Sequence, residues 1–216
     1  MNRSSSVASA GLVLAAAVGV FGIAFGAGAV SAGASLWQAC AMSLAVFTGA
    51  SQFSAVSVVA AGGGTVAALG GATLLAARNG VYALAMSRLL ADSALGTRLV
   101  AAQITIDEST AMAIAAGHGP EARRAFWVTG IGVYVFWNLG TVIGALAGSA
   151  VDPGVFGLDA AFPAGFVAML APLMSQPAHR AAAIGGAAIC LVAIPILPVG
   201  LPILCAAVAV VFGVRR

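Results

Sequence analysis

Long apolar runs separated by short polar connections make up most of this chain. The runs cover residues 10–32, 36–61, 65–89, 125–149, 162–175 and 181–214. An α-helix needs about 20 apolar residues to cross a bilayer, so most of these runs are long enough for one crossing. The last run would be about 51 Å long as one helix, beyond a hydrocarbon core of about 30 Å. The segment from Pro195 to Pro202 therefore predicts the turn of a hairpin. Together the runs predict an all-α membrane bundle of about seven transmembrane helices, some of them broken.

The composition agrees with a membrane protein. Hydrophobic residues make up 62% of the sequence and charged residues 7%, against about 45–50% and 25% in soluble domains. We therefore expect one integral membrane domain over residues 1–216. Cys40, Cys190 and Cys205 lie apart in apolar runs, without metal-ligand spacing, which predicts free thiols and no metal site. We expect no cofactor, and no basic, aromatic-rich patch points to nucleic acid.

The connection 91–124 is the most polar stretch and predicts how the bundle is oriented. Cytoplasmic loops of membrane proteins are enriched in arginine and lysine. If this connection is cytoplasmic, the arginines that lie inside are Arg88, Arg98, Arg123, Arg124, Arg180, Arg215 and Arg216. Only Arg3 then lies outside. With seven crossings, this distribution predicts an N-terminus outside and a C-terminus inside.

A polar segment, Thr48-Gly49-Ala50-Ser51-Gln52, interrupts the second apolar run. Glycine and hydroxyl side chains loosen helical hydrogen bonding, so we expect a break or kink between Thr48 and Gln52. An unwound segment would offer backbone amides and carbonyls to a solute. Alternatively, Thr48 and Ser51 bond back to their own helix and Gln52 binds a neighbouring helix.

Arg78 lies in an otherwise uncharged run from Thr65 to Ser87. Arginine at the centre of a spanning helix costs about 2.5–3.5 kcal/mol on insertion scales, so it needs a partner. We expect Arg78 to be buried beside the break at Gly49, with Asn79 and Tyr82 on adjoining helix faces. Its partner is either a solute carboxylate or an acid of the connection. The alternative is that Arg78 extends to the membrane interface.

Asp107 and Glu108 follow the apolar sequence Ile104-Thr105-Ile106. Acids at a membrane boundary suit proton coupling, but Thr105 or Asp107 could equally cap a short helix that begins near Glu108. Trp137, Asn138 and Thr141 form a polar strip that either lines a site or bonds helices together. The candidate solute-binding residues are Thr48, Gly49, Ser51, Gln52, Arg78, Asn79, Tyr82 and Asn138.

Glycines recur at four-residue spacing in the first and fourth spans. The two faces are Gly22/Gly26 and Gly140/Gly144/Gly148. Small residues at this spacing let helix backbones approach closely, either within the chain or against a partner. Spans one and four each precede a span that polar residues interrupt or follow, which suggests an internal duplication, although direct identity between the halves is poor. A three-span unit that is repeated would be inverted, as in secondary transporters.

Several of these motifs, in this order, resemble the AzlC-type large subunit of branched-chain amino acid exporters. The motifs are Gly22-Ile23-Ala24-Phe25-Gly26, Met42-Ser43, Phe47 to Phe53, Arg78 with Tyr82, and Thr105-Ile106-Asp107-Glu108. The resemblance implies a cell-membrane permease that exports valine, leucine or isoleucine with the proton gradient, beside a small AzlD-type membrane protein. Two positions depart from the family pattern, with Val20 in place of proline and Asn79 in place of histidine.

Two other function classes compete with transport. One is a non-transporting subunit whose glycine faces serve assembly, and it would scatter the polar residues among helix contacts instead of gathering them around a cavity. The other is an intramembrane enzyme, which the missing GxSxG and HExxH motifs argue against. We therefore expect no enzyme activity.

Overall fold

The computed structural model describes residues 3–150, 167 and 170–214. These residues form helices and connections, with no strand among them, so the predicted all-α class is confirmed. Two helical segments are long and apolar enough to cross a membrane, Val7–Ser31 and Pro120–Ser149. The predicted count of seven crossings is therefore not confirmed. Most of the predicted run at 162–175 and the connection before it lie outside the described residues.

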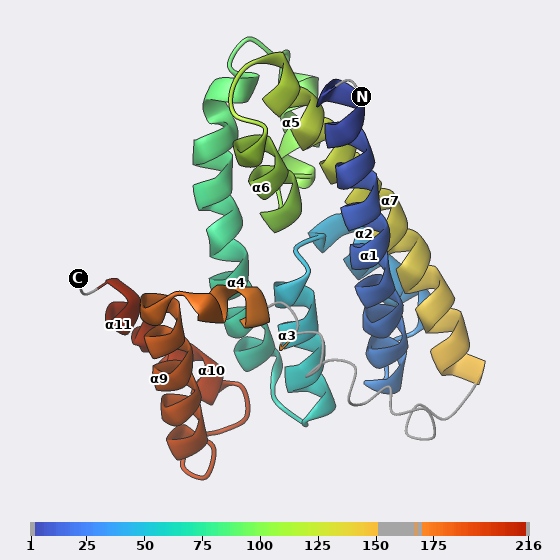
Figure 1. Cartoon of the computed structure of the whole chain (residues 1–216). Coiled ribbons are helices and arrows are strands. Elements are labelled where there is room, and N and C mark those ends of the chain that lie inside the picture. The colour runs from blue at the N-terminus through green and yellow to red at the C-terminus, as the bar shows by residue number, and fades with distance from the viewer. Residues whose placement is uncertain (1–2, 151–166, 168–169, 215–216) are drawn as a thin grey trace.

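Helices α1 (Arg3–Ser31) and α7 (Pro120–Ala150) form the most extensive helix pair of the described chain. Neighbours along the pair are Gly11 and Thr129, Gly22 and Trp137, Gly26 and Thr141, and Ala27 and Gly148. Residue numbers rise together in both helices, so α1 and α7 are parallel (Figure 1). Both glycine faces lie in this seam, where backbone meets backbone. Of the two predicted roles, packing within the chain and packing against a partner protein, the structure shows packing within the chain.

The second apolar run forms a hairpin of two half-length helices, and the prediction of a single broken crossing was wrong. Helices α2 (Leu36–Val46) and α3 (Ala50–Ala60) have 11 residues each, about 16 Å or half a bilayer. The start of α2 and the end of α3 lie at the same end of the bundle, because Gln38 and Val59 line one groove there. The tip of this hairpin lies in the middle of the bundle (Figure 1).

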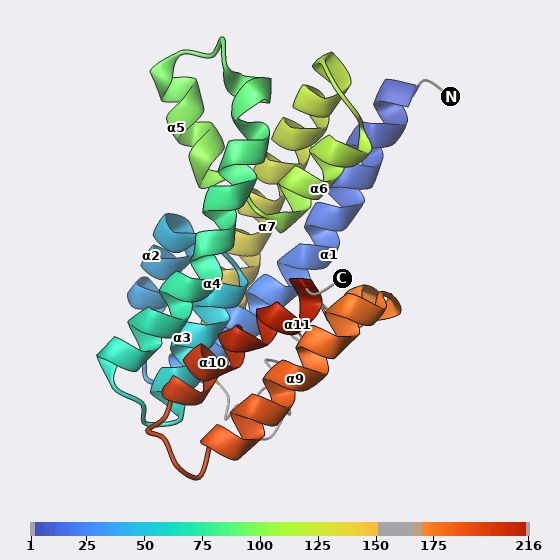
Figure 2. The ribbon, with the colours of Figure 1, turned by 90° about the vertical axis from the view of Figure 1, so that its left-hand side faces the viewer.

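A second hairpin enters from the opposite end. Helices α5 (Leu95–Gln103) and α6 (Asp107–Ala115) have nine residues each. In Figure 2 they lie above α2 and α3, with the tips of both hairpins near mid-height. The Gln103 side-chain amide donates a hydrogen bond to the Leu44 carbonyl over 2.8 Å. This bond joins the end of α5 to the end of α2, so the two hairpin tips meet.

Helix α4 (Thr65–Met86) connects the two hairpins and runs opposite to α1 (Figure 1). A short turn of 3₁₀ helix, η1 (Ser87–Leu90), follows it. The order of one long and two short helices thus occurs twice, in α1–α3 and in α4–α6, in opposite directions. The repeat that we expected would have started at α1 and α7. These two helices are parallel, so a repeat with those boundaries is not inverted.

The direction of α1 contradicts the prediction that the N-terminus and the connection 91–124 lie on opposite sides. Helices α1 and α7 both begin at the end of the bundle where η1 leads into α5, the upper end in Figure 1. Arg3 therefore lies at the same end as the connection that carries Arg98 and Arg123. We had placed Arg3 on the opposite side, because residues 36–61 were counted as a crossing. A hairpin that returns to its own end does not change sides.

The C-terminal part forms the predicted hairpin. Helix α9 (Pro177–Ala193) is preceded by the 3₁₀ turn η4 (Ala171–Ser175) and packs against α10 (Leu201–Ala206) and α11 (Val210–Val214). The 3₁₀ turn η5 (Ala207–Ala209) links the last two helices. The chain reverses through residues 194–200, as the proline-rich segment predicted. Cys40, Cys190 and Cys205 are free thiols, as expected.

Candidate functional site

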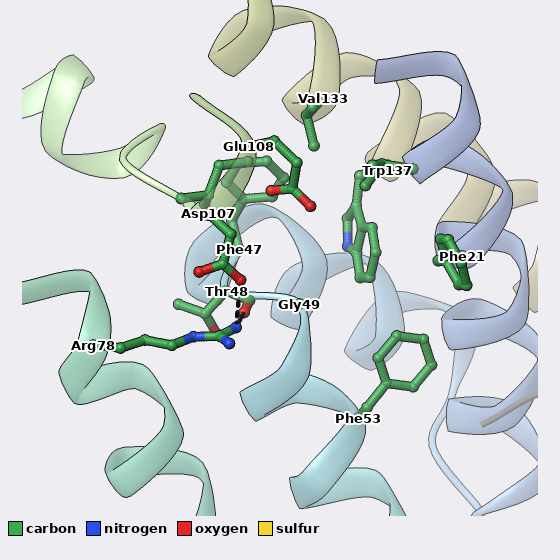
Figure 3. A pocket seen from close by; sticks show the side chains of 12 residues that line it. Phe21, Phe47, Thr48, Gly49, Phe53, Arg78, Asp107, Glu108, Val133 and Trp137 are labelled. Atoms are coloured by element: carbon green, nitrogen blue, oxygen red, sulfur yellow. Dashed lines mark hydrogen bonds and ion pairs between the residues drawn. The ribbon is translucent and has the colours of Figure 1, made fainter. Parts of the chain in front are cut away.

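A cavity of about 100 Å³ lies where the tips of the two hairpins meet α1, α4 and α7 (Figure 3). We call it the central cavity. A buried water needs about 10–15 Å³ by a comparable measure, so several waters or a small solute fit. Polar groups from α4, α6 and the α2–α3 connection lie on one side, and apolar side chains from α1, α3 and α7 lie on the other.

The break between α2 and α3 forms the floor of the polar side. Helix α2 ends at Val46 and α3 begins at Ala50. Between them Phe47 has φ 32° and Gly49 has φ 60°, both in the left-handed region. This conformation costs a non-glycine residue about 1–2 kcal/mol, and burial of the Phe47 ring against Tyr134, with centroids 4.8 Å apart, helps to hold it. The predicted break is confirmed, although Ser51 and Gln52 belong to the first turn of α3.

Gln52 fixes the break in place. Its side-chain oxygen accepts hydrogen bonds from the backbone N–H of Thr48 (3.3 Å) and of Gly49 (3.1 Å). Its side-chain nitrogen donates to the Met42 carbonyl over 3.1 Å. Ser51 pairs with the Thr48 hydroxyl. The full burial of Gln52 and Ser51 makes them structural supports of the break, in the role that we had given as the alternative.

Arg78 links both hairpin tips to α4. A terminal guanidinium nitrogen lies 2.9 Å from Asp107 Oδ2 in α6 and donates to the Thr48 carbonyl over 3.4 Å. The predicted neighbour, the break around Gly49, is confirmed. The side chain is 32% exposed, so Arg78 is half-buried and not buried as we expected. An exposed ion pair contributes little, but this one joins three elements at once.

Asp107 and Glu108 occupy the first turn of α6, where the helix dipole favours negative charge. Neither Thr105 nor Asp107 caps this helix with its side chain. Thr105 donates instead to the Ala101 carbonyl, and Ser109 accepts the N–H of Ile106, the capping residue. Both acids line the central cavity, and Figure 3 shows the Glu108 carboxylate directed into it.

An aromatic wall faces these charges. Trp137 stacks on Phe25 with centroids 5.9 Å apart, and Phe53 meets the Trp137 ring edge-on at 5.8 Å. Phe21 and Val133 complete this side of the central cavity. We had named Trp137 only as part of a polar strip, and the other apolar residues of the wall were missed as site residues. Apolar residues in an apolar helix carry no signal in the sequence that tells a cavity from a helix contact.

Five of the ten candidate residues line the central cavity: Thr48, Gly49, Arg78, Asp107 and Glu108. Tyr82 lies next to this set, within interaction range of Asp107. Asn79 is half-buried outside the cavity lining. Asn138 donates to the Tyr134 carbonyl of its own helix, and Thr141 pairs with Ser43 between α7 and α2. In the described part of the chain, no group of His, Cys, Asp and Glu could hold a metal ion.

The family model described as AzlC protein matches residues 13–151. The chain belongs to the AzlC family. The AzlC match runs from α1 to the end of α7 and so contains both hairpins and all ten candidate residues. Membership places the chain among transport-related membrane proteins. No curated protein and no solved structure matches the AzlC chain.

Proposed function

We propose that this AzlC chain is the solute-binding subunit of a secondary transporter that exports branched-chain or other hydrophobic amino acids. The observation that carries the proposal is the division of the central cavity into a charged side and an aromatic side. An amino acid with an apolar side chain has the same division. Its carboxylate and ammonium need charged partners, while its side chain needs an apolar wall.

The unpaired polar atoms at the central cavity match both charges of such a solute. Arg78 Nε is a buried donor and Asp107 Oδ1 a buried acceptor, and neither has a hydrogen-bond partner within the described chain. Buried polar groups are normally satisfied, and an unmade bond costs about 1–3 kcal/mol. A solute carboxylate would satisfy the guanidinium, and a solute ammonium would satisfy the acid.

The balance of charge supports exchange of the solute for a proton. One guanidinium and two carboxylates line the central cavity, so a proton would neutralise the surplus negative charge, whereas the ammonium of a zwitterionic amino acid would pair with one of these carboxylates. Both would use the oxygens of Asp107 and Glu108. A proton and the solute would therefore bind alternately, as an exporter driven by an inward proton gradient requires.

The two hairpins suit alternating access in a multi-pass protein of the cell membrane. Broken helices that meet near mid-bilayer are typical of secondary transporters. The segments that carry Arg3, Arg88, Arg98, Arg123 and Arg124 share the upper end, whereas the turns at residues 31–35 and 61–64 contain no charge. This asymmetry favours an upper end in the cytoplasm, with the N-terminus inside. We treat residues 1–216 as one integral membrane domain in which residues 36–61 form a hairpin and not a crossing.

A small AzlD-type membrane partner remains part of the proposal on the family resemblance alone, because the glycine faces are used between α1 and α7. The competing hypothesis of a non-transporting assembly subunit is less favoured. It requires polar residues to scatter among helix contacts, whereas charged groups from α4 and α6 meet the α2–α3 break at one cavity.

Efflux from cells tests the proposal. Cells with and without the full chain, and with and without an AzlD-type protein, are preloaded with leucine-containing dipeptides. We expect chain-dependent efflux that Arg78→Ala abolishes while membrane insertion is kept. The matched control is Arg88→Ala, an exposed arginine just beyond α4. Efflux that does not depend on the chain, or an Arg78→Ala variant as active as the wild type, would refute the proposal.

A further inference from the structure

Trp137 presents a buried hydrogen-bond donor that has no partner among the described residues. The residue is 4% exposed, and its indole Nε1 makes no hydrogen bond to any described group. Trp137 lines the central cavity. In Figure 3 its nitrogen is on the edge of the ring that faces Glu108 and the helix break. The indole N–H can only donate, so its missing partner is an acceptor.

The packing around Trp137 fixes the direction of this donor. Phe25 stacks on one face of the indole at an interplanar angle of 23°, and the Phe53 ring is nearly perpendicular to it, at 89°. The Trp137 backbone is held against Gly22, where a Cβ would lie 2.5 Å from the Trp137 carbonyl oxygen. The ring therefore cannot turn its N–H toward another acceptor without repacking the seam between α1 and α7.

We infer that Trp137 is a specificity-determining residue that donates its indole N–H to the carboxylate of the transported amino acid. This inference rests on the proposed function and deepens it. Trp137 stands on the aromatic side, so a carboxylate bound between it and Arg78 places the solute side chain against Phe21 and Phe53. A preorganised donor favours a carboxylate over an uncharged amide, because hydrogen bonds to charged acceptors are roughly twice as strong.

Transport kinetics test the inference in membrane vesicles that contain the full chain and its partner. Trp137→Phe keeps an aromatic ring and removes the N–H. We expect the KM for L-leucine to rise about tenfold or more, as the loss of a bond to a charged group predicts. The inhibition constant of leucinamide, which lacks the carboxylate, should change by less than about threefold. The control is Trp127→Phe, on the same helix but outside the lining of the central cavity, and it should change neither constant.

A second readout does not depend on how Trp137→Phe folds. The chain has three tryptophans, so ¹⁵N-indole labelling gives three N–H signals, and Trp37→Phe and Trp127→Phe assign the third. L-leucine should move the Trp137 signal and leave the other two in place.

An unmoved Trp137 signal, an unchanged KM for L-leucine, or equal rises in the KM for L-leucine and in the inhibition constant of leucinamide would overturn the inference while leaving transport itself intact. A changed pH profile without a changed KM would also overturn it, because the N–H would then serve Glu108. A wild-type chain that neither binds nor transports L-leucine overturns the proposed function and this inference together.

Discussion

Gly144→Ala should separate α1 from α7 and destabilise the whole bundle. A Cβ at this position would lie 2.7 Å from the carbonyl carbon of Ile23 and 2.9 Å from its Cα, closer than the 3.4 Å at which ordinary contact begins. These are backbone atoms, which cannot swing aside as a side chain does. The two helices must therefore move apart by at least about 0.7 Å (3.4 minus 2.7 Å) near this position.

The expected loss follows from that displacement. A gap of about 0.5–1 Å forfeits a quarter to a half of the dispersion energy of each opened contact. Overpacking of a tight site typically costs about 1–3 kcal/mol. Because the seam is the most extensive helix contact of the described chain, we expect at least about 2 kcal/mol. That corresponds to a melting temperature lower by about 4 °C or more for a chain of this size.

The assay is thermal unfolding of the purified full chain in mild detergent, followed by size-exclusion chromatography. Gly80→Ala is the matched control, since it also adds one methyl group within a helix but has nothing within 4 Å of the new Cβ. Gly80→Ala should melt at or slightly above the wild-type temperature, because alanine favours the helix. If Gly144→Ala melts within about 1 °C of Gly80→Ala, the parallel α1–α7 seam is wrong. If it loses only a bound partner, the glycine face serves association instead.

Three further predictions follow from the break, the hairpin path and the shared carboxylates. Gln52→Ala leaves the backbone N–H groups of Thr48 and Gly49 without their side-chain acceptor and should cost at least about 2 kcal/mol in the same melting assay. Gln38→Ala, at an exposed cap, should cost less than about 1 kcal/mol, and equal losses would contradict the role of Gln52. In a cysteine-free background, Ser4→Cys and Asp92→Cys should react with an impermeant maleimide from the same side of the membrane, and Ala61→Cys should react from the other side. Labelling of positions 4 and 92 from opposite sides would instead support the topology predicted from the sequence, in which residues 36–61 cross the membrane once. Lowering the pH should weaken L-leucine binding to the wild type, because protons and the ammonium compete for Asp107 and Glu108, and tighter binding at low pH would exclude that competition.

The local chemistry of the site could be read from the sequence because it rests on large energies. A lone guanidinium in an apolar run needs a partner, and Arg78 has two in Asp107 and Thr48. The break at Gly49 was visible for a similar reason, since a glycine between hydroxyl residues interrupts a helix. These inferences use only the residues themselves and the bilayer.

The path of the chain could not be read in the same way. Residues 36–61 have the length of one crossing and also of two half-crossings, and hydropathy does not record direction. The left-handed conformations at Phe47 and Gly49 decide between the two, and phenylalanine gives no warning of such a backbone. The predicted side of the N-terminus relative to the connection 91–124 was wrong as a consequence, because residues 36–61 were counted as a crossing between α1 and α4. The sequence did not predict a role for the Trp137 N–H, because this donor is left without a partner only when Phe25 and Phe53 fix the direction of the ring.

Calorimetric titration of the purified full chain with L-leucine, together with any partner that co-purifies, decides whether the central cavity is the amino acid site. The comparison is Arg78→Lys, which keeps a positive charge beside Asp107 but loses the planar donor fork, with Arg88→Lys as the matched control. We expect saturable binding by the wild type and by Arg88→Lys, and binding weakened about tenfold or more in Arg78→Lys at an unchanged melting temperature. Equal affinity in Arg78→Lys and the wild type, or no saturable binding by the wild type, would show that the cavity between the hairpin tips is not the amino acid site.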